Sequence, residues 1–129
     1  MKILVTGDRG YIGATLVPML RKKYEVIGYD SGYFSENLLE QFDEDYIKIT
    51  KDIRDISRED LEEVDGIIHL AGLSNDPLGE FSPKLTEEIN YSGTIRLAEM
   101  AKDIGVSRFV YASSQSMYGV SDTSNELDE

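Results

Sequence analysis

Three glycines follow the first apolar segment of the chain at intervals of three residues. Lys2–Thr6 (KILVT) is short, β-branched and almost wholly apolar, which is typical of a strand buried on both faces of a parallel sheet. Gly7, Gly10 and Gly13 come directly after it, and an amphipathic segment, Tyr11–Lys23, continues from there. A strand, a glycine-rich turn and a helix in this order predict the first half of a β-α-β unit.

Such a turn is suited to binding phosphate. The first glycine permits a tight turn, the second lets a phosphate approach the backbone, and the third lets the helix pack closely. The N-terminus of the helix offers free N–H groups and the positive end of its dipole. We therefore predict that a dinucleotide pyrophosphate binds here, in contact with Gly7, Arg9, Gly10, Tyr11, Ile12 and Gly13. The alternative is a glycine-rich turn that binds no ligand.

A carboxylate ends the second predicted strand, Glu25–Tyr29. Asp30 could accept hydrogen bonds from both ribose hydroxyls of adenosine, with Ser31 beside it. The same carboxylate would repel a 2′-phosphate, which favours NAD over NADP as the cofactor. Arg9 acts in the opposite direction, because a guanidinium within the loop could bind such a phosphate. The alternative role of Asp30 is to initiate a turn before the Ser-Gly pair that follows it.

Strands and helices alternate along the rest of the chain. We predict further strands at Tyr46–Ile49, Gly66–Leu70 and Ser107–Ala112, and helices at Ser35–Phe42, Ser57–Glu63 and from Ser82 to about Asp103. This alternation predicts a Rossmann-type α/β fold, a doubly wound parallel sheet of about five strands in the order 3-2-1-4-5. Its fifth strand would be an apolar edge, so we expect a homo-oligomer that associates through it. We assign residues 1–119 to one incomplete NAD-binding domain and residues 120–129 to an acidic tail where a continuation would start.

Composition excludes several classes of function. The formal net charge is −12, from 25 acidic and 13 basic residues, which argues against nucleic acid or an anionic membrane as the main partner. There is no cysteine, so disulfides and cysteine-based metal sites are excluded, and we predict no metal site. No apolar run approaches the roughly 20 residues that span a bilayer. We expect no signal peptide, because a strand-like run begins directly after Met1. We expect a soluble, cytoplasmic protein.

Five short blocks occur in order and together span nearly the whole chain. They are Thr6-Gly7-x-x-Gly10-x-Ile12-Gly13, Asp52-Ile53-Arg54-Asp55, His69-Leu70-Ala71-Gly72, Asn90-Tyr91-Ser92-Gly93-Thr94 and Ser113-Ser114-Gln115-Ser116-Met117-Tyr118-Gly119. The ordered set resembles the NAD-dependent epimerase/dehydratase family, extended short-chain dehydrogenases/reductases that act on nucleotide sugars. The resemblance implies hydride transfer from a sugar carbon to NAD, chemistry on the resulting ketone, and return or release of the hydride.

The resemblance also implies contacts for the cofactor. Asp52 would bind the exocyclic amine of adenine and Ile53 would lie against its ring, although a strand-exit Asp and a core Ile would explain the same pair. Leu70, Ala71 and Gly72 would lie along the pyrophosphate and the nicotinamide ribose, where small residues let the backbone come close.

The resemblance also implies roles for other residues of the last three blocks. Asn90 is a predicted cofactor-binding residue that would bridge backbone and active-site water, unless it is an ordinary polar residue of a helix, and His69 is interpreted as structural. Ser114, five residues before the Gly of a Tyr-Gly pair, would bond the substrate oxygen during hydride loss and is the predicted catalytic residue. Gln115 and Ser116 are predicted substrate contacts. They stand where dehydratases carry Asp and Glu, which disfavours dehydration and leaves epimerase, ketoreductase or decarboxylase chemistry open.

One element of the family's chemistry is missing from these residues. The family uses a Tyr as general acid/base, with a Lys four residues later that lowers its pKa. None of the eight tyrosines has a Lys at that position, and the sequence continues only 15 residues beyond Ser114. We therefore expect the N-terminal, NAD-binding portion of a longer enzyme, inactive by itself. A non-catalytic NAD(P)-sensing module and a flavodoxin-like module without a dinucleotide are the alternatives.

Overall fold

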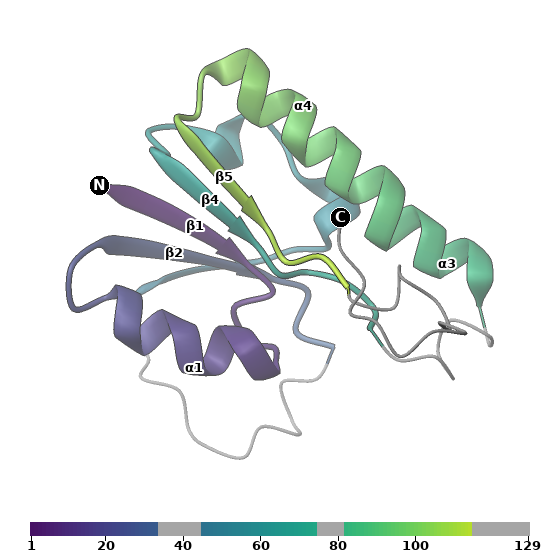
Figure 1. Cartoon of the computed structure of the whole chain (residues 1–129), viewed down its shortest axis with the longest axis horizontal. Coiled ribbons are helices and arrows are strands. Elements are labelled where there is room, and N and C mark those ends of the chain that lie inside the picture. The colour runs from purple at the N-terminus through teal and green to yellow at the C-terminus, as the bar shows by residue number, and fades with distance from the viewer. Residues whose placement is uncertain (34–44, 75–81, 115–129) are drawn as a thin grey trace, which may run out of the picture.

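A five-stranded parallel sheet organises the chain (Figure 1). The computed structural model describes residues 1–33, 45–74 and 82–114. The strands follow the order β3-β2-β1-β4-β5, which confirms the predicted Rossmann-type topology. Their bounds are β1 (Lys2–Thr6), β2 (Glu25–Asp30), β3 (Ile47–Thr50), β4 (Gly66–His69) and β5 (Arg108–Tyr111).

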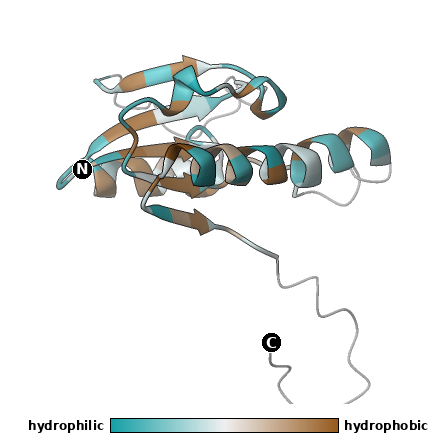
Figure 2. Cartoon of the chain, turned by 90° about the horizontal axis from the view of Figure 1, so that it is seen from above, coloured by the Kyte–Doolittle hydropathy of each residue, from teal (hydrophilic) through white to brown (hydrophobic). Residues whose placement is uncertain are grey.

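The central strand β1 shows why the first apolar segment lacks alternation. It pairs in parallel with both β2 and β4, so that Leu4 lies opposite Ile27 on one side and Ile67 on the other. Helices cover both faces of the sheet, so successive side chains are buried whichever way they point. Figure 2 shows the resulting apolar residues along the strands.

The core therefore has two layers, one on each face of the sheet. On one face, α1 (Tyr11–Leu20) covers a cluster made by Ile3, Val5, Val17 and Val26. On the other, the long C-terminal helix covers a larger cluster that includes Leu4, Ile27, Tyr29, Ile53, Ile56, Leu61, Ile67, Leu97 and Ala101. Residues Ile3 and Val5 face α1 and Leu4 faces the other layer, as the two-residue period of a strand requires.

The helix expected from Ser82 to about Asp103 is present as three consecutive helical segments. These are α3 (Pro83–Glu87), a π-helical turn η4 (Glu88–Gly93) and α4 (Thr94–Ile104). A Cβ at Gly93 would lie 3.3 Å from Cγ2 of Ile53, so the glycine lets this helix pack against the segment that follows β3. The expectation that a side chain is unwelcome at residue 93 is confirmed.

Two helix predictions need correction. The helix predicted over Ser57–Glu63 is wrong, because that segment holds only a 3-10 turn, η3 (Glu59–Leu61), after a similar turn, η2 (Ile53–Asp55). The segment starts as a helix would, because the carboxylate of Asp60 accepts bonds from the backbone N–H and hydroxyl of Ser57. Glu63, however, is left-handed at φ 60°, so no helix continues toward β4. Helix α1 ends at Leu20, three residues before its predicted end.

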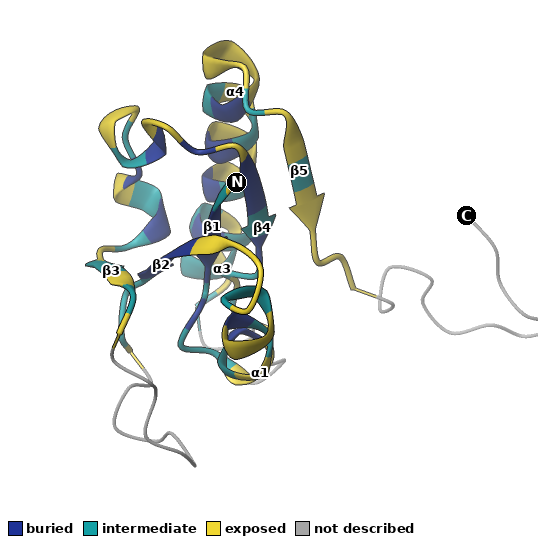
Figure 3. Cartoon of the chain, turned by 90° about the vertical axis from the view of Figure 1, so that its left-hand side faces the viewer, coloured by how far each residue is buried: buried dark blue, intermediate teal, exposed yellow. Residues whose placement is uncertain are grey.

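Some expectations fall outside the described residues. The short helix predicted over 35–42 and the acidic segment 120–129 both lie wholly there, so the structure tests neither the helix nor the domain bounds. In the described ranges, no helix combines the length and the apolar character needed to cross a bilayer. Figure 3 shows β5 as the exposed edge strand beside β4.

Candidate functional site

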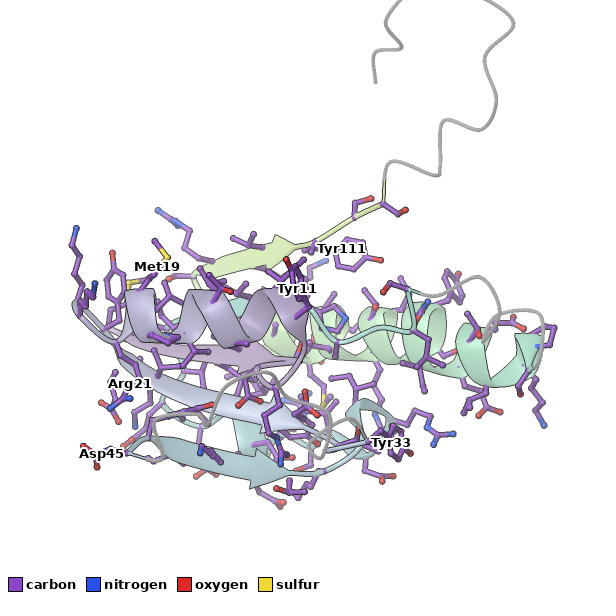
Figure 4. The ribbon with its side chains drawn as sticks, turned by 90° about the horizontal axis from the view of Figure 1, so that it is seen from below. Tyr11, Met19, Arg21, Tyr33, Asp45 and Tyr111 are labelled. Carbon is purple, nitrogen blue, oxygen red and sulfur yellow. The ribbon has the colours of Figure 1, made fainter. Side chains whose placement is uncertain are left out.

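The predicted site residues gather at one edge of the sheet because all five strands are parallel. The glycine loop follows β1, Asp30 ends β2, residues 70–73 follow β4, and Ser114 follows β5. The strand order reverses between β1 and β4, and open α/β sheets bind ligands in the crevice at such a switch point. Figure 4 shows Tyr11, Tyr33 and Tyr111 at this end of the sheet, and Met19, Arg21 and Asp45 toward the opposite end.

Two of the three loop glycines are required by contacts within the protein. Gly7 has a φ of 73°, and its N–H donates to the carbonyl of Tyr29 at 2.8 Å. A Cβ at Gly7 would lie 2.8 Å from the backbone nitrogen of Ala71, and a Cβ at Gly13 would overlap the carbonyl oxygens of Gly7 and Asp8. The loop, α1 and the segment after β4 therefore pack backbone against backbone.

Gly10 is less constrained by contacts within the protein than Gly7 and Gly13. Its φ of −78° and ψ of 175° are extended backbone that any residue adopts, and a Cβ would meet only the Gly7 carbonyl oxygen, at 3.3 Å. It is the N-cap of α1 and has no side chain to cap the first N–H groups of that helix, which lack intrahelical partners. The open side of Gly10 and these donors form a cradle suited to an anion that approaches the backbone.

Asp30 lies beside this cradle, held by backbone donors. Its carboxylate accepts from the N–H of Arg9 at 3.2 Å and from that of Gly32 at 2.7 Å. The Arg9 side chain turns back onto β2 and β3, where Nη2 donates to the Asp30 carbonyl at 2.6 Å and to Oγ1 of Thr50 at 3.1 Å. Asp30 thus forms a turn with Gly32, which is the alternative role stated for it above. It also accepts a hydrogen bond from the N–H of Arg9 in the glycine loop.

Asp52 has a different environment from the one its predicted role requires. Oδ1 accepts from N and Nε of Arg54, and Oδ2 accepts from Nη2 of Arg54 and, at 3.0 Å, from the hydroxyl of Tyr33. These bonds from Arg54 lower the pKa of Asp52 to about 2. Four bonds fill the acceptor directions of a carboxylate. Ile53 is buried in the core, which is the packing role that sequence had left open for it.

The segment after β4 is fixed by Asn90. The side-chain oxygen of Asn90 accepts from the N–H of Leu73 at 2.7 Å, and its NH₂ donates to the carbonyl of Leu73 at 2.8 Å. The side-chain amide of Asn90 thus bonds both the N–H and the carbonyl of Leu73, and it fixes the segment 70–73 against the π-helical turn η4. On the other side, the N–H groups of Leu70 and Ala71 donate to the backbone oxygen and Oγ1 of Thr6.

His69 is buried at the end of β4, between two threonines. Its Nδ1 lies 2.6 Å from Oγ1 of Thr6 and its Nε2 lies 2.8 Å from Oγ1 of Thr94. Its ring stacks on Tyr111 at 5.6 Å between centroids. Burial lowers the pKa of His69 to about 4. These contacts fit the structural role expected of it.

Sequence analysis missed Asp8 and Tyr46. Asp8 is only 1% exposed, and its carboxylate covers Gly28 of β2 so closely that a Cβ there would overlap it. The hydroxyl of Tyr46 donates to Oδ2 of Asp8 at 2.7 Å. Burial raises the pKa of Asp8, while the bond from Tyr46 opposes this rise. A glycine inside the strand EVIGYD was the available signal, because an isolated strand glycine often marks a close approach.

The substrate end of the site is described only in part. Ser114 lies three residues beyond β5, and the N–H of Ala112 donates to the carbonyl of His69, which ties this exit to β4. The predicted substrate residues Gln115 and Ser116 lie outside the described residues. In the part of the chain that the structure covers, no cluster of three or more His, Cys, Asp or Glu is placed to hold a metal ion.

Comparison with known proteins places this geometry in a family. The model of the NAD dependent epimerase/dehydratase family matches residues 3–129. A UDP-glucose 4-epimerase of Klebsiella pneumoniae is 34% identical over 131 residues, covering 92% of this chain and 93% of that protein. A UDP-glucose 4-epimerase of Bacillus subtilis is 33% identical over 134 residues, covering 96% of this chain but 40% of the relative.

The fold has the same relatives. The structure of a Thermus thermophilus UDP-glucose 4-epimerase in complex with NAD superimposes with a TM-score of 0.84 at 26% identity. The match covers 100% of this chain and 43% of that one, so the present residues span less than half of the Bacillus and Thermus proteins. The ordered motifs, the sheet and these matches agree: the chain belongs to the NAD-dependent epimerase/dehydratase family.

Proposed function

We propose that this chain binds NAD and forms the cofactor-binding portion of an enzyme that epimerises, reduces or decarboxylates a nucleotide sugar. The observation that carries the proposal is Gly10. Its backbone conformation suits any residue and a Cβ would make one tight contact, so contacts within the protein call for glycine less strongly than at Gly7 and Gly13, and a ligand against the backbone would account for it. The Thermus relative binds NAD, which supports the identity of that ligand.

The remaining contacts follow from the geometry of the edge. The first N–H groups of α1 would bind the pyrophosphate, and Asp30, oriented by the N–H groups of Arg9 and Gly32, would accept from the adenosine ribose hydroxyls. Residues 70–72 would line the nicotinamide side, because Asn90 and Thr6 fix their backbone. NAD, when bound, supplies a hydride acceptor, and the protein orients it.

The predicted contact between Asp52 and the exocyclic amine of adenine requires a rearrangement of side chains. All four acceptor directions of Asp52 are filled, three by Arg54 and one by Tyr33. The adenine amine can reach this carboxylate only if a donor leaves. The phenol of Tyr33 is the more easily displaced, because its side chain is 60% exposed and contributes a single bond.

These residues would supply only part of the family's chemistry. Ser114 lies at the carboxyl edge of the sheet, where its hydroxyl could bond the substrate oxygen that loses hydride. A Tyr with a Lys four residues later, the family's proton donor and acceptor, does not occur in these 129 residues. We therefore expect NAD binding without turnover by this chain.

Calorimetric titration of the chain with NAD tests the proposal. We expect binding by the unmodified chain and none by Gly10→Val, whose side chain would fill the cradle while the fold stays intact by circular dichroism. The matched control is Gly66→Ala at the start of β4, at the opposite end of the strand from the site, where the backbone is not left-handed and a Cβ would meet its neighbours at 3.5 Å or more. Absence of NAD binding by the unmodified chain, or equal affinity in Gly10→Val, would contradict the proposal.

A further inference from the structure

Two carboxylates lie on the same face of β2, next to the proposed ribose site. Gly28 and Asp30 alternate with Tyr29, so they face the same side of the sheet. The carboxylate of Asp8 covers Gly28, which places it one step behind Asp30 along the strand. Burial is the main cause of the raised pKa of Asp8. The charge of Asp30 adds to the rise, while Tyr46 and Arg9 oppose it, so these groups act on one another.

Arg9 supplies positive charge to this corner, but it is already engaged. Its Nη2 bonds the Asp30 carbonyl and the Thr50 hydroxyl, and its Nε lies 4.0 Å from Oδ1 of Asp30. The charges of both Arg9 and Asp30 act on Asp8, so that when Asp8 is ionised one guanidinium stands against two carboxylates and the three side chains carry an excess of negative charge. With Asp30 alone, the corner would be balanced and Arg9 could turn to an incoming phosphate.

We propose that Asp8 is a second specificity-determining residue, which acts with Asp30 to exclude a dinucleotide that carries a phosphate on its adenosine ribose. A 2′-phosphate brings a charge of about −1.5 to −2 to a corner that is already negative. Asp8 thereby decides the competition between Arg9 and Asp30 that sequence left open. The inference rests on the proposed binding of NAD and deepens it.

Tyr46 is the positioning residue for Asp8. Its hydroxyl donates to Oδ2, and a donor to the carboxylate favours the charged form. The aromatic ring of Tyr46 makes cation–π contacts with two side chains: the guanidinium carbon of Arg21 lies 5.4 Å and Nζ of Lys48 lies 4.9 Å from its centroid. The carboxylate is therefore kept in one place beneath the loop and keeps a charge-stabilising donor despite its burial.

The test compares the affinities for NADP and NAD, measured by calorimetry at pH 8 on the whole chain. Asp8→Asn keeps the shape and an acceptor for Tyr46 but removes the charge. We expect it to bind NADP more tightly, so that the preference for NAD falls on the order of tenfold. Glu99→Gln, which removes one exposed negative charge from α4 on the other face of the sheet, is the matched control and should leave the preference unchanged.

The ratio of the NAD and NADP affinities separates an effect of charge from a distortion of the glycine loop, because a distorted loop would weaken the binding of both nucleotides alike. Tyr46→Phe keeps the carboxylate and removes its donor, so we expect a smaller fall in the preference than in Asp8→Asn. Should Asp8→Asn fail to fold, Asp8→Ser, whose hydroxyl can accept from Tyr46, decides the question.

An unchanged preference in a folded Asp8 variant overturns this inference, as does a preference that rises in Tyr46→Phe. Either result leaves the proposed function standing, because NAD still binds. If the unmodified chain bound neither nucleotide, the proposed function would fail and this inference with it.

Discussion

Nε2 of His69 lies 2.8 Å from Oγ1 of Thr94, which joins the end of β4 to the first residue of α4. The hydroxyl of Thr94 donates to the carbonyl of Asn90 at 2.7 Å, so toward the imidazole it must accept, and Nε2 carries the proton. Nδ1 is then the acceptor for the hydroxyl of Thr6, which itself accepts from the N–H of Ala71. Each donor in this chain has one acceptor, and a second proton on His69 would break it.

The neutral form of His69 makes stability depend on pH. Its pKa is lowered by burial to about 4 in the folded chain, against about 6.5 in an unfolded chain, so between these values the unfolded state binds more protons. Stability is fully present above about pH 6.5 and is lost as the pH falls toward 4. We expect a loss of about 2 kcal/mol between pH 7 and pH 5, measured by urea unfolding.

The control for this prediction is His69→Gln, because His69 is the chain's single histidine. The variant is expected to be less stable at pH 7 but to lose much less stability down to pH 5. An equal loss in the two proteins would show that other groups cause the pH dependence.

The same substitution is expected to destabilise the fold much more at Gly13 than at Gly10. A Cβ at Gly13 would overlap backbone oxygens of Gly7 and Asp8, which cannot move as a side chain could, so Gly13→Ala should destabilise the fold by about 2 kcal/mol or more. Gly10→Ala should change the free energy of unfolding by less than about 0.5 kcal/mol. Thermal and urea unfolding of both variants measure this contrast, and similar stabilities would contradict the close packing at Gly13.

The sequence predicted the sheet well because its strands are buried on both faces. KILVT and GIIHL are apolar without alternation, the glycines mark the turn, and the carboxyl ends of parallel strands meet at one edge. The strand order and the gathering of Gly7, Asp30 and Ala71 at one edge followed from these local patterns. The length of the helix in the 57–63 segment could not be judged in this way, since the left-handed backbone of Glu63, which ends the turn before β4, has no signal in the local pattern.

Contacts between distant residues account for what sequence analysis missed. Asp8 and Tyr46 are 38 residues apart, and Tyr33 and Asp52 are 19 apart, so no local pattern links them. Arg54 was noted only as part of a motif, yet it supplies three of the four bonds to Asp52 and an ion pair at 3.0 Å to Glu88. The bonds of Arg54 to Asp52 and Glu88 alter the electrostatics of the candidate site. These electrostatics depend on tertiary packing rather than on residue type alone.

Tyr33→Phe tests whether the adenine end is occupied by the protein itself. The change removes one donor from Asp52 and leaves the three bonds from Arg54, so an acceptor direction opens toward solvent. We expect little change in stability, because the side chain is exposed, and NAD affinity that rises about three- to tenfold, the worth of one hydrogen bond. Calorimetry with NAD measures it. Weaker binding would mean that the phenol assists the nucleotide instead.

The exposed edge of the sheet gives the last prediction. Within residues 1–33, 45–74 and 82–114, β4 is the only strand that pairs with β5, and Val110 of β5 is 57% exposed. An apolar strand with unpaired backbone groups is a template for pairing with a second copy, so we expect self-association of this chain that rises with concentration in light scattering. Val110→Lys should make the chain monomeric, because a charged edge opposes such pairing.

The matched control is Ile47→Lys on β3, the opposite edge of the sheet, where Ile47 is 55% exposed. This change should leave the association intact. A chain that is monomeric at high concentration without either change contradicts the prediction, and equal loss of association in both variants would show that the contact is not specific to β5.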